Sequence, residues 1–231
     1  LAEKRDLLFH VDACVGGFLL PLFRELGAPV PDFDFSVPQV TSISMDFHKY
    51  AFCPKGASAI LYCDEELRKH QIFSWSGWPG YTLINPTLQS SKSGGPLAAT
   101  WAVLRYLGME GYLHYAKGLL GARKAVLEGV EKIPGLHVMG KPDMTLFALG
   151  SDDINLYVLC DRMQARGWTM QAQTRVGQLP PSIHINLIPL NVDRMDLWLS
   201  DLAACVEEAR EKPGGDELAG LKKRAGDLFT K

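Results

Sequence analysis

Two short apolar runs, each leading to a charged residue, constrain the fold of this chain more than any other feature. The run 7–11 ends at Asp12, and the strand-like run 42–46 is followed closely by Lys49. Short apolar runs of this kind are typical of buried strands. Neighbouring strands of an open α/β sheet place the residues that follow them at one crevice, where such sheets bind ligands. The sequence therefore predicts an α/β sheet with Asp12 and Lys49 at a shared site.

Asp12 and Lys49 are the two charges that pyridoxal 5'-phosphate (PLP) chemistry requires. A lysine ε-amine forms the Schiff base that holds this cofactor, and an aspartate keeps its pyridine nitrogen protonated. Apolar elements flank Lys49 on both sides, so we expect a depressed pKa, which favours Schiff-base formation. Most lysines are solvated surface charges, and Asp12 alone could be a turn or cap residue. The two residues together therefore indicate the cofactor.

Three further residues are candidates for the same site. His48, beside Lys49, is expected to contact the cofactor phosphate or imine, with a core histidine as the alternative. His10 lies on the first predicted strand, where a histidine buried in the core is the favoured interpretation. Lys55 is interpreted as a second catalytic amine, an anion contact or a plain loop charge, and the sequence leaves these alternatives open.

A phosphate site is predicted just before a helix in the middle of the chain. Ser91, Lys92 and Ser93 precede two glycines and Pro96, which is suited to the first turn of a helix. Small hydroxyls, backbone N–H groups and a cation at a helix N-terminus favour phosphate binding. Helix capping explains part of this pattern, so phosphate binding and capping are both kept as interpretations.

The first half of the chain alternates between predicted strands and helices. A long loop, 74–95, interrupts the pattern and is longer than compact domains usually tolerate without a functional reason. Its aromatic residues Trp75, Trp78 and Tyr81 either line a substrate channel or pin the loop to the core. The predicted strands are 7–11, 41–45 and 57–62, and the predicted helices are 65–70, a buried helix at 97–107, and 112–132.

A small α/β domain is predicted to follow. We assign 1–111 to the C-terminal portion of a large domain, 112–211 to a linking helix and the small domain, and 212–231 to a flexible tail. The small domain is expected to hold strands at 136–139, 145–149, 168–171 and 183–187, with helices at 154–166 and 191–210.

Composition excludes several classes of protein. A net charge of −2 gives no electrostatic reason to expect nucleic acid or an anionic membrane as a partner. No apolar run reaches the roughly 18 residues of a membrane span. The five cysteines are scattered without a C-x-x-C pair, which favours reduced thiols in the cytoplasm over a metal site or disulfides. No signal peptide opens the chain, which reads as the later part of a longer protein.

The chain resembles the sphingosine phosphate lyases, which are PLP enzymes of the group II decarboxylase superfamily. The matching motifs keep the family's order over about residues 7–210. In the first half they are 10–19, 33–38, 40–44, 48–50, 54–58, 86–87, 93–95, 98–102 and 108–112. In the second half they are 148–151, 167–168 and 180–184.

This resemblance implies PLP-dependent fold type I, the aspartate aminotransferase-like fold, with a partial, mainly parallel large domain and a small C-terminal α/β domain. It implies a homodimer in which Lys49 forms the Schiff base, Asp12 faces the pyridine nitrogen and His48 lies beside the cofactor. Cys14 and Lys55 match the lyases rather than most decarboxylases. Ser91 and Ser93 are expected at the cofactor.

The resemblance also implies a reaction, with alternatives. A lyase of this family cleaves a phosphorylated sphingoid base to a long-chain aldehyde and phosphoethanolamine. The alternatives are a decarboxylase of glutamate, tyrosine or aspartate, and a catalytically incomplete fragment or dimerisation module. Two departures from the family pattern are the segment 90–92, which replaces Gly-Ser-Arg, and Met45 and Phe47, which replace small or polar residues. A membrane anchor upstream, as in endoplasmic reticulum forms, is compatible with the chain.

Overall fold

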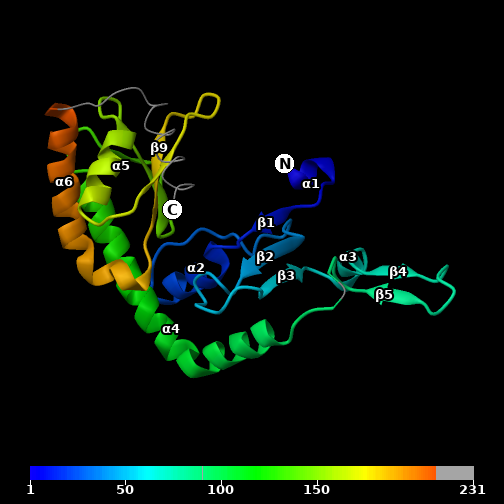
Figure 1. The fold of residues 1–231 in the computed structure, drawn as a ribbon. Helices are drawn as coiled ribbons and strands as arrows, with labels where there is room; N and C mark the ends of the chain where they lie inside the picture. Colours follow the sequence, from blue (N-terminus) through cyan, green and yellow to red (C-terminus); the bar gives the residue numbers. More distant parts are fainter. Residues whose placement is uncertain (90, 212–231) are drawn as a thin grey trace. The chain divides into compact units, whose positions relative to one another are not determined.

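A computed structural model describes residues 1–89 and 91–211, which form two compact units (Figure 1). The first unit is Leu1–Ala116 and the second begins at Lys117. Each unit is described by itself below. Ser90 and the predicted tail 212–231 lie outside the described residues, and the domain limits proposed from the sequence remain predictions.

The first unit is built on a three-stranded sheet in the order β1-β2-β3 (Figure 1). The strands are β1 (His10–Asp12), β2 (Ser42–Asp46) and β3 (Ser58–Tyr62). β1 pairs with β2 in parallel, and Asp12 lies opposite Ser44. β3 pairs with β2 in antiparallel fashion, and Asp46 lies opposite Ser58. The pairing therefore collects polar residues where β1 and β2 end.

Helix α2 (Gly16–Glu25) follows β1 and packs against β2. Its buried face carries Leu19, Leu22 and Phe23 at helical spacing. Gly17 permits the close approach, because a Cβ there would lie 3.0 Å from Ala13 Cβ and 3.2 Å from Met45 Cγ. A methyl group at this position would be tighter than ordinary packing and would require Ala13 or Met45 to shift by a few tenths of an ångström.

Strand β1 is shorter than the predicted strand 7–11. Residues 7–9 are exposed, with Leu8 at 74% of its full accessibility. Among the described residues β1 has β2 as its neighbour on one side and no strand on the other, so the run has nothing to bury it on that side. The expectation of a core histidine was also wrong, because His10 is exposed.

The predicted loop 74–95 contains regular structure that the sequence did not indicate. β4 (Phe73–Trp75) and β5 (Leu83–Asn85) form a two-stranded antiparallel hairpin after helix α3 (Glu65–Lys69) (Figure 1). Strands of three residues are too short to leave a clear periodic pattern. Trp75, Trp78 and Tyr81 are all exposed, so within this chain they do not pin the hairpin to the core.

The predicted helices 97–107 and 112–132 join as α4 (Gly95–Val130), which is interrupted at Gly108. Gly108 has φ 57° and ψ −175°, a backbone conformation that suits glycine. The first segment was expected to be buried, and this was wrong: Trp101 and Tyr106 are 67% and 88% exposed. The sequence pattern predicts an apolar helix, but this chain does not supply the surface that would cover it. No helix in the described part of the chain is long and apolar enough to span a membrane.

The second unit is a four-stranded antiparallel sheet in the order β6-β7-β9-β8, with helices α5 and α6 packed together. The predicted strand at 168–171 begins later than expected, since Trp168 is buried ahead of β8 and donates from Nε1 to Asp201 Oδ2 at 2.7 Å. The elements are β6 (His137–Met139), β7 (Leu146–Gly150), α5 (Leu156–Ala165), β8 (Gln171–Gln173), β9 (Ser182–Asn186), a 3-10 turn η1 (Pro189–Arg194) and α6 (Met195–Glu211).

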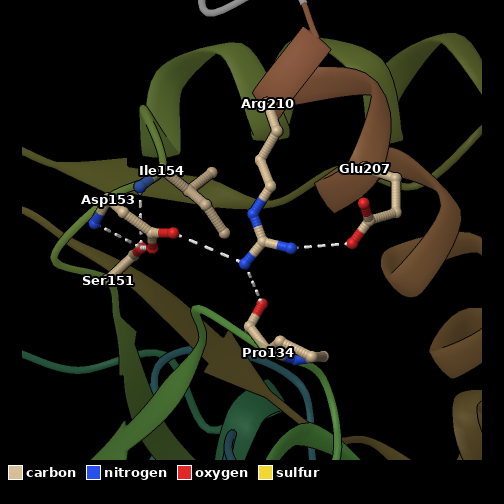
Figure 2. A network of polar contacts seen from close by, with 6 residues as sticks. All are labelled: Pro134, Ser151, Asp153, Ile154, Glu207 and Arg210. Atoms are coloured by element: carbon tan, nitrogen blue, oxygen red, sulfur yellow. Dashed lines mark hydrogen bonds and ion pairs between the residues drawn. The ribbon is translucent and has the colours of Figure 1, made fainter.

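Arg210, near the end of α6, connects this helix to two loops of the second unit (Figure 2). Its guanidinium donates to Pro134 O at 2.6 Å and to Glu207 Oε1 at 2.8 Å, and it pairs with Asp153 Oδ2 at 3.4 Å. Gly135 leaves room for this group, because a Cβ there would collide with Arg210 and lie 2.7 Å from Asp153 Oδ1. Planar guanidinium donors suit such shared recognition.

We expect Gly135→Ala to destabilise the chain more than Gly167→Ala. The two glycines have nearly the same φ, 86° and 88°, but a Cβ at Gly167 meets no atom within 4 Å. Backbone strain alone should cost about 1 kcal/mol at either position, and Gly135→Ala should add the loss of the Arg210 contacts. Urea unfolding of both variants measures the difference. Equal free energies of unfolding would show that Arg210 yields without cost.

Candidate active site

Asp12 lies at the end of β1 and is fixed by two donors. Its Oδ1 accepts from the backbone N–H of Cys14 at 3.1 Å and from Ser44 Oγ at 3.1 Å. Hydrogen bonds from the side chain and backbone of Cys14 hold the pKa of Asp12 below its usual value, with further contributions from Ser44 and from the positive charge of Lys49. The carboxylate is therefore ionised and exposed at the strand end.

Lys49 follows β2 in a tight loop closed by hydrogen bonds. Cys53 N donates to Phe47 O at 3.1 Å, and Phe52 N donates to Lys49 O at 3.0 Å. Phe52 adopts a left-handed backbone with φ 58°, which is costly for a residue other than glycine and occurs in turns and at functional sites. The loop thus holds Lys49 in one defined position after the strand.

The pKa of Lys49 is raised, which corrects the expectation of a depressed value. The main cause is a hydrogen bond with the Cys14 side chain; partial burial works in the opposite direction, and the Asp46 carboxylate adds to the rise. Lys49 Nζ lies 3.0 Å from Asp46 Oδ2. Apolar flanks in the sequence suggested desolvation, but the acceptors around the amine outweigh it.

Cys14 contacts both Asp12 and Lys49, the two residues that the sequence predicts at one site. Its backbone N–H donates to Asp12, and its side chain is hydrogen-bonded to Lys49. Asp12 and Lys49 are therefore brought to one site, as expected from two neighbouring strands that end at the same edge.

His48 and Asp46 complete the cluster. His48 Nδ1 lies 3.3 Å from Ala57 O, and its Nε2 lies 3.7 Å from Asp46 Oδ2. Asp46 also accepts from Ser58 Oγ at 2.5 Å. Asp46 was not among the site residues predicted from the sequence. Its position three residues before Lys49, at the polar end of a strand, was the signal that could have found it.

Lys55 lies on the same β2–β3 connection as Lys49, whereas Ser91 and Ser93 lie just ahead of α4. Lys55, Ser91 and Ser93 are exposed, and Ser93 Oγ accepts from Gly95 N at 3.3 Å. A Cβ on Gly56 would lie 3.1 Å from Pro96 Cγ, so the Lys55 loop reaches the start of α4. Within the described residues, no hydrogen bond or ion pair joins these three side chains to Asp12 or Lys49.

His10 was expected in the core, but it lies on β1 beside the serines that neighbour Asp12. Its Nδ1 lies 2.8 Å from Ser42 Oγ and its Nε2 lies 3.3 Å from Ser44 Oγ. Ser44 in turn donates to Asp12. The parallel register of the two strands places these residues side by side, which the sequence of either strand alone cannot show.

Aromatic rings support the Lys49 loop from α4. Tyr112 OH donates to Ala51 O at 2.8 Å, and the ring of Phe52 stacks on Tyr112 with centroids 6.1 Å apart. Tyr115 contacts the edge of Phe52 at 5.3 Å, and Phe18 of α2 contacts Tyr112 at 4.8 Å. These contacts hold Phe52 in its strained conformation.

Comparison with known proteins identifies the family. The pattern of the pyridoxal-dependent decarboxylase conserved domain matches residues 1–149. The chain belongs to this family. It is 42% identical over 214 residues to a sphingosine-1-phosphate lyase of Oryza sativa and 44% identical over 214 residues to one of Arabidopsis thaliana. Each alignment covers 93% of this chain and 39% of the relative, so the chain spans about two fifths of the length of these relatives.

Solved structures give the same family and fold. The sphingosine-1-phosphate lyase of Burkholderia pseudomallei matches with a TM-score of 0.85 and 38% identity, over 100% of this chain and 51% of that one. A glutamate decarboxylase of Lactobacillus brevis matches with a TM-score of 0.73 over 90% of this chain and 49% of that one. At 20% identity the second match shows the fold alone. The predicted PLP-dependent fold type I is confirmed.

The site fits the cofactor of this family, pyridoxal phosphate. The cofactor requires a carboxylate for its pyridine nitrogen and a lysine amine for its aldehyde carbon. Here an ionised carboxylate lies at the end of one strand, and a lysine amine follows the next. Asp12 is exposed and Lys49 is partly exposed, so both groups are within reach of a bound molecule.

We expect Tyr112→Phe to lower the free energy of unfolding by about 1 kcal/mol at pH 8, because Ala51 O loses its buried donor. Burial raises the pKa of Tyr112 to about 12. The native state therefore keeps a proton that the unfolded chain loses near about pH 10. This stabilisation is complete below about pH 10 and is lost as pH rises through about 12.

Urea unfolding at pH 8 and pH 11 measures both effects. Wild type should lose more stability than Tyr112→Phe over this interval. Tyr115→Phe, which removes a hydroxyl from a more exposed ring, serves as the control and should follow wild type. An unchanged pH dependence in Tyr112→Phe would contradict the role of burial.

Proposed function

We propose that this chain belongs to a PLP-dependent carbon–carbon lyase that cleaves a phosphorylated sphingoid base to a long-chain aldehyde and phosphoethanolamine. Identity of 42% and 44% to two sphingosine-1-phosphate lyases over 93% of the chain carries this proposal. Asp12, Cys14, His48, Lys49 and Lys55 all lie within the aligned family match.

The residues of the cluster have separate tasks in this proposal. Lys49 holds the cofactor, Asp12 keeps the pyridine nitrogen protonated, and His48 lies beside the ring. When bound, PLP supplies an electron sink for the carbon that loses its bond. Ser91 and Ser93 are assigned to the cofactor phosphate, since they precede the N-terminus of α4.

Lys55 and Cys14 favour the lyase over a decarboxylase. Lys55 is exposed on the loop that reaches the start of α4, where its amine can bind a substrate phosphate or accept the proton of the C3 hydroxyl. Cys14 contacts both Asp12 and Lys49, whereas decarboxylases usually have alanine there. A group II amino-acid decarboxylase acting on glutamate, tyrosine or aspartate is the second candidate, because the family domain is shared.

We also propose a homodimer in the cytoplasm. The exposed aromatic residues of the β4–β5 hairpin and the first segment of α4 form apolar surface that a second copy would cover. Trp78, Trp101 and Tyr106 are among these exposed residues. The alternative from another functional class is that this chain holds only part of each active site and is inactive without further sequence.

Product analysis separates the two activities. With PLP present, the enzyme containing this chain should release a long-chain aldehyde from a phosphorylated sphingoid base and no CO₂ from glutamate, tyrosine or aspartate. Lys55→Ala should lower aldehyde release at least about tenfold, because a positioned acid–base group contributes this much or more, without affecting cofactor attachment. Release of CO₂ with no aldehyde would establish the decarboxylase instead.

Lys49 should be the sole site of covalent cofactor attachment. We expect Lys49→Ala to abolish both turnover and the mass gain seen after borohydride treatment with PLP, because no other amine lies beside Asp12 among the described residues. Peptide mapping locates the modified lysine. Lys69→Ala, which removes an exposed lysine of α3, is the matched control and should retain both properties. Modification at Lys55 in the Lys49→Ala variant would overturn the assignment.

A further inference from the structure

Asp46 is the group on which the polar contacts of the Lys49 loop converge. Its Oδ2 lies 3.0 Å from Lys49 Nζ and 3.7 Å from His48 Nε2. Its Oδ1 accepts from Ser58 Oγ at 2.5 Å. The Asp46 side chain is only 17% exposed, so these contacts are partly shielded from water and less screened than a surface pair.

The strand pairing explains why this carboxylate has a fixed direction. Asp46 is the last residue of β2, and Ser58 is directly opposite it on β3. The hydroxyl of Ser58 occupies one carboxylate oxygen, which leaves the other toward Lys49 and His48. His48 faces an oxygen acceptor from each ring nitrogen, Ala57 O on one side and Asp46 on the other.

We propose that Asp46 is a positioning residue, which holds the Lys49 amine beside Cys14 while Ser58 fixes the carboxylate. It touches neither cofactor nor substrate in this proposal and acts through Lys49. Its importance for turnover rests on the proposed function, but its effect on Lys49 does not. The amine is held from two sides, by Asp46 at the end of its own strand and by Cys14 after β1.

The charged and titratable groups around Lys49 determine what removal of Asp46 does. They are Asp46 at the end of β2, His48 on the Lys49 loop, Asp12 at the end of β1 and Cys14 in the turn after it. The raised pKa of Lys49 has Cys14 as its largest cause and Asp46 as a further one. Loss of the Asp46 charge should therefore release a larger fraction of neutral, nucleophilic amine at a given pH.

Competitive acetylation of the full chain across a pH series, read by peptide mass spectrometry, tests this directly. Asp46→Asn keeps the shape of the side chain and removes its charge. We expect its half-labelling pH at Lys49 to fall, with labelling at a fixed pH below that point about threefold faster or more. Asp46→Glu should restore the wild-type midpoint at least in part, because the charge returns.

A matched control separates this pair from an ordinary surface ion pair. Glu66 and Lys69 have the same spacing in the sequence and lie 2.5 Å apart, but they are 81% and 64% exposed. Glu66→Gln should change the labelling of Lys69 by less than about twofold. Ser58→Ala frees the carboxylate but keeps its charge. It should shift the half-labelling pH of Lys49 in the same direction as Asp46→Asn, by a smaller amount. Ser58→Ala replaces Asp46→Asn in the test if circular dichroism shows that Asp46→Asn does not fold.

The outcomes distinguish this proposal from the proposed function. Unchanged Lys49 labelling in folded Asp46→Asn, or in Ser58→Ala where Asp46→Asn is unfolded, overturns the role of Asp46, whatever the enzyme catalyses. A wild-type enzyme that fails to attach PLP at Lys49 overturns the proposed function, while the labelling series still measures Asp46. Faster labelling in Asp46→Asn with restoration in Asp46→Glu supports the positioning role.

Discussion

The parallel pairing of β1 with β2 is the interaction on which the candidate site depends. It sets Asp12 opposite Ser44, so a hydroxyl of one strand donates to a carboxylate of the other. The turn after β1 then brings Cys14 to Lys49. A slip of one residue in this register would turn the side chains of one strand to the opposite face and separate these groups.

Packing around the sheet maintains that register. Gly17 allows α2 to lie close to β2, with Ala13 and Met45 as near neighbours. On the other side of the Lys49 loop, Tyr112 binds Ala51 O and its ring stacks on Phe52. The left-handed backbone of Phe52 is thus supported by contacts from α4, which is how a strained residue persists in a folded chain.

Electrostatics in the cluster arise from hydrogen bonds more than from burial. The pKa of Asp12 is lowered and that of Lys49 is raised, in both cases with Cys14 as the first cause. The two residues remain oppositely charged, and each is partly open to solvent. This arrangement keeps a carboxylate and an amine close to one another, and these are the two charges that PLP chemistry requires.

The sequence by itself determined the secondary structure of most of the chain and singled out Asp12 and Lys49 as candidate site residues. Asp12 and Lys49 could be paired because each follows a strand-like run, and the family motifs around them are specific. Apolar composition, however, does not say what covers an apolar surface. Trp101 and Tyr106 lie in a helix, as predicted, but are exposed in this chain.

Only the tertiary structure decided which neighbours each charge has. The antiparallel register of β2 and β3 put Ser58 against Asp46, and the turn after β1 put Cys14 beside Lys49. These contacts join residues from different strands, and local periodicity carries no information about them. The pKa of Lys49 consequently moved in the direction opposite to that suggested by its flanks, because acceptors from other strands outweigh desolvation.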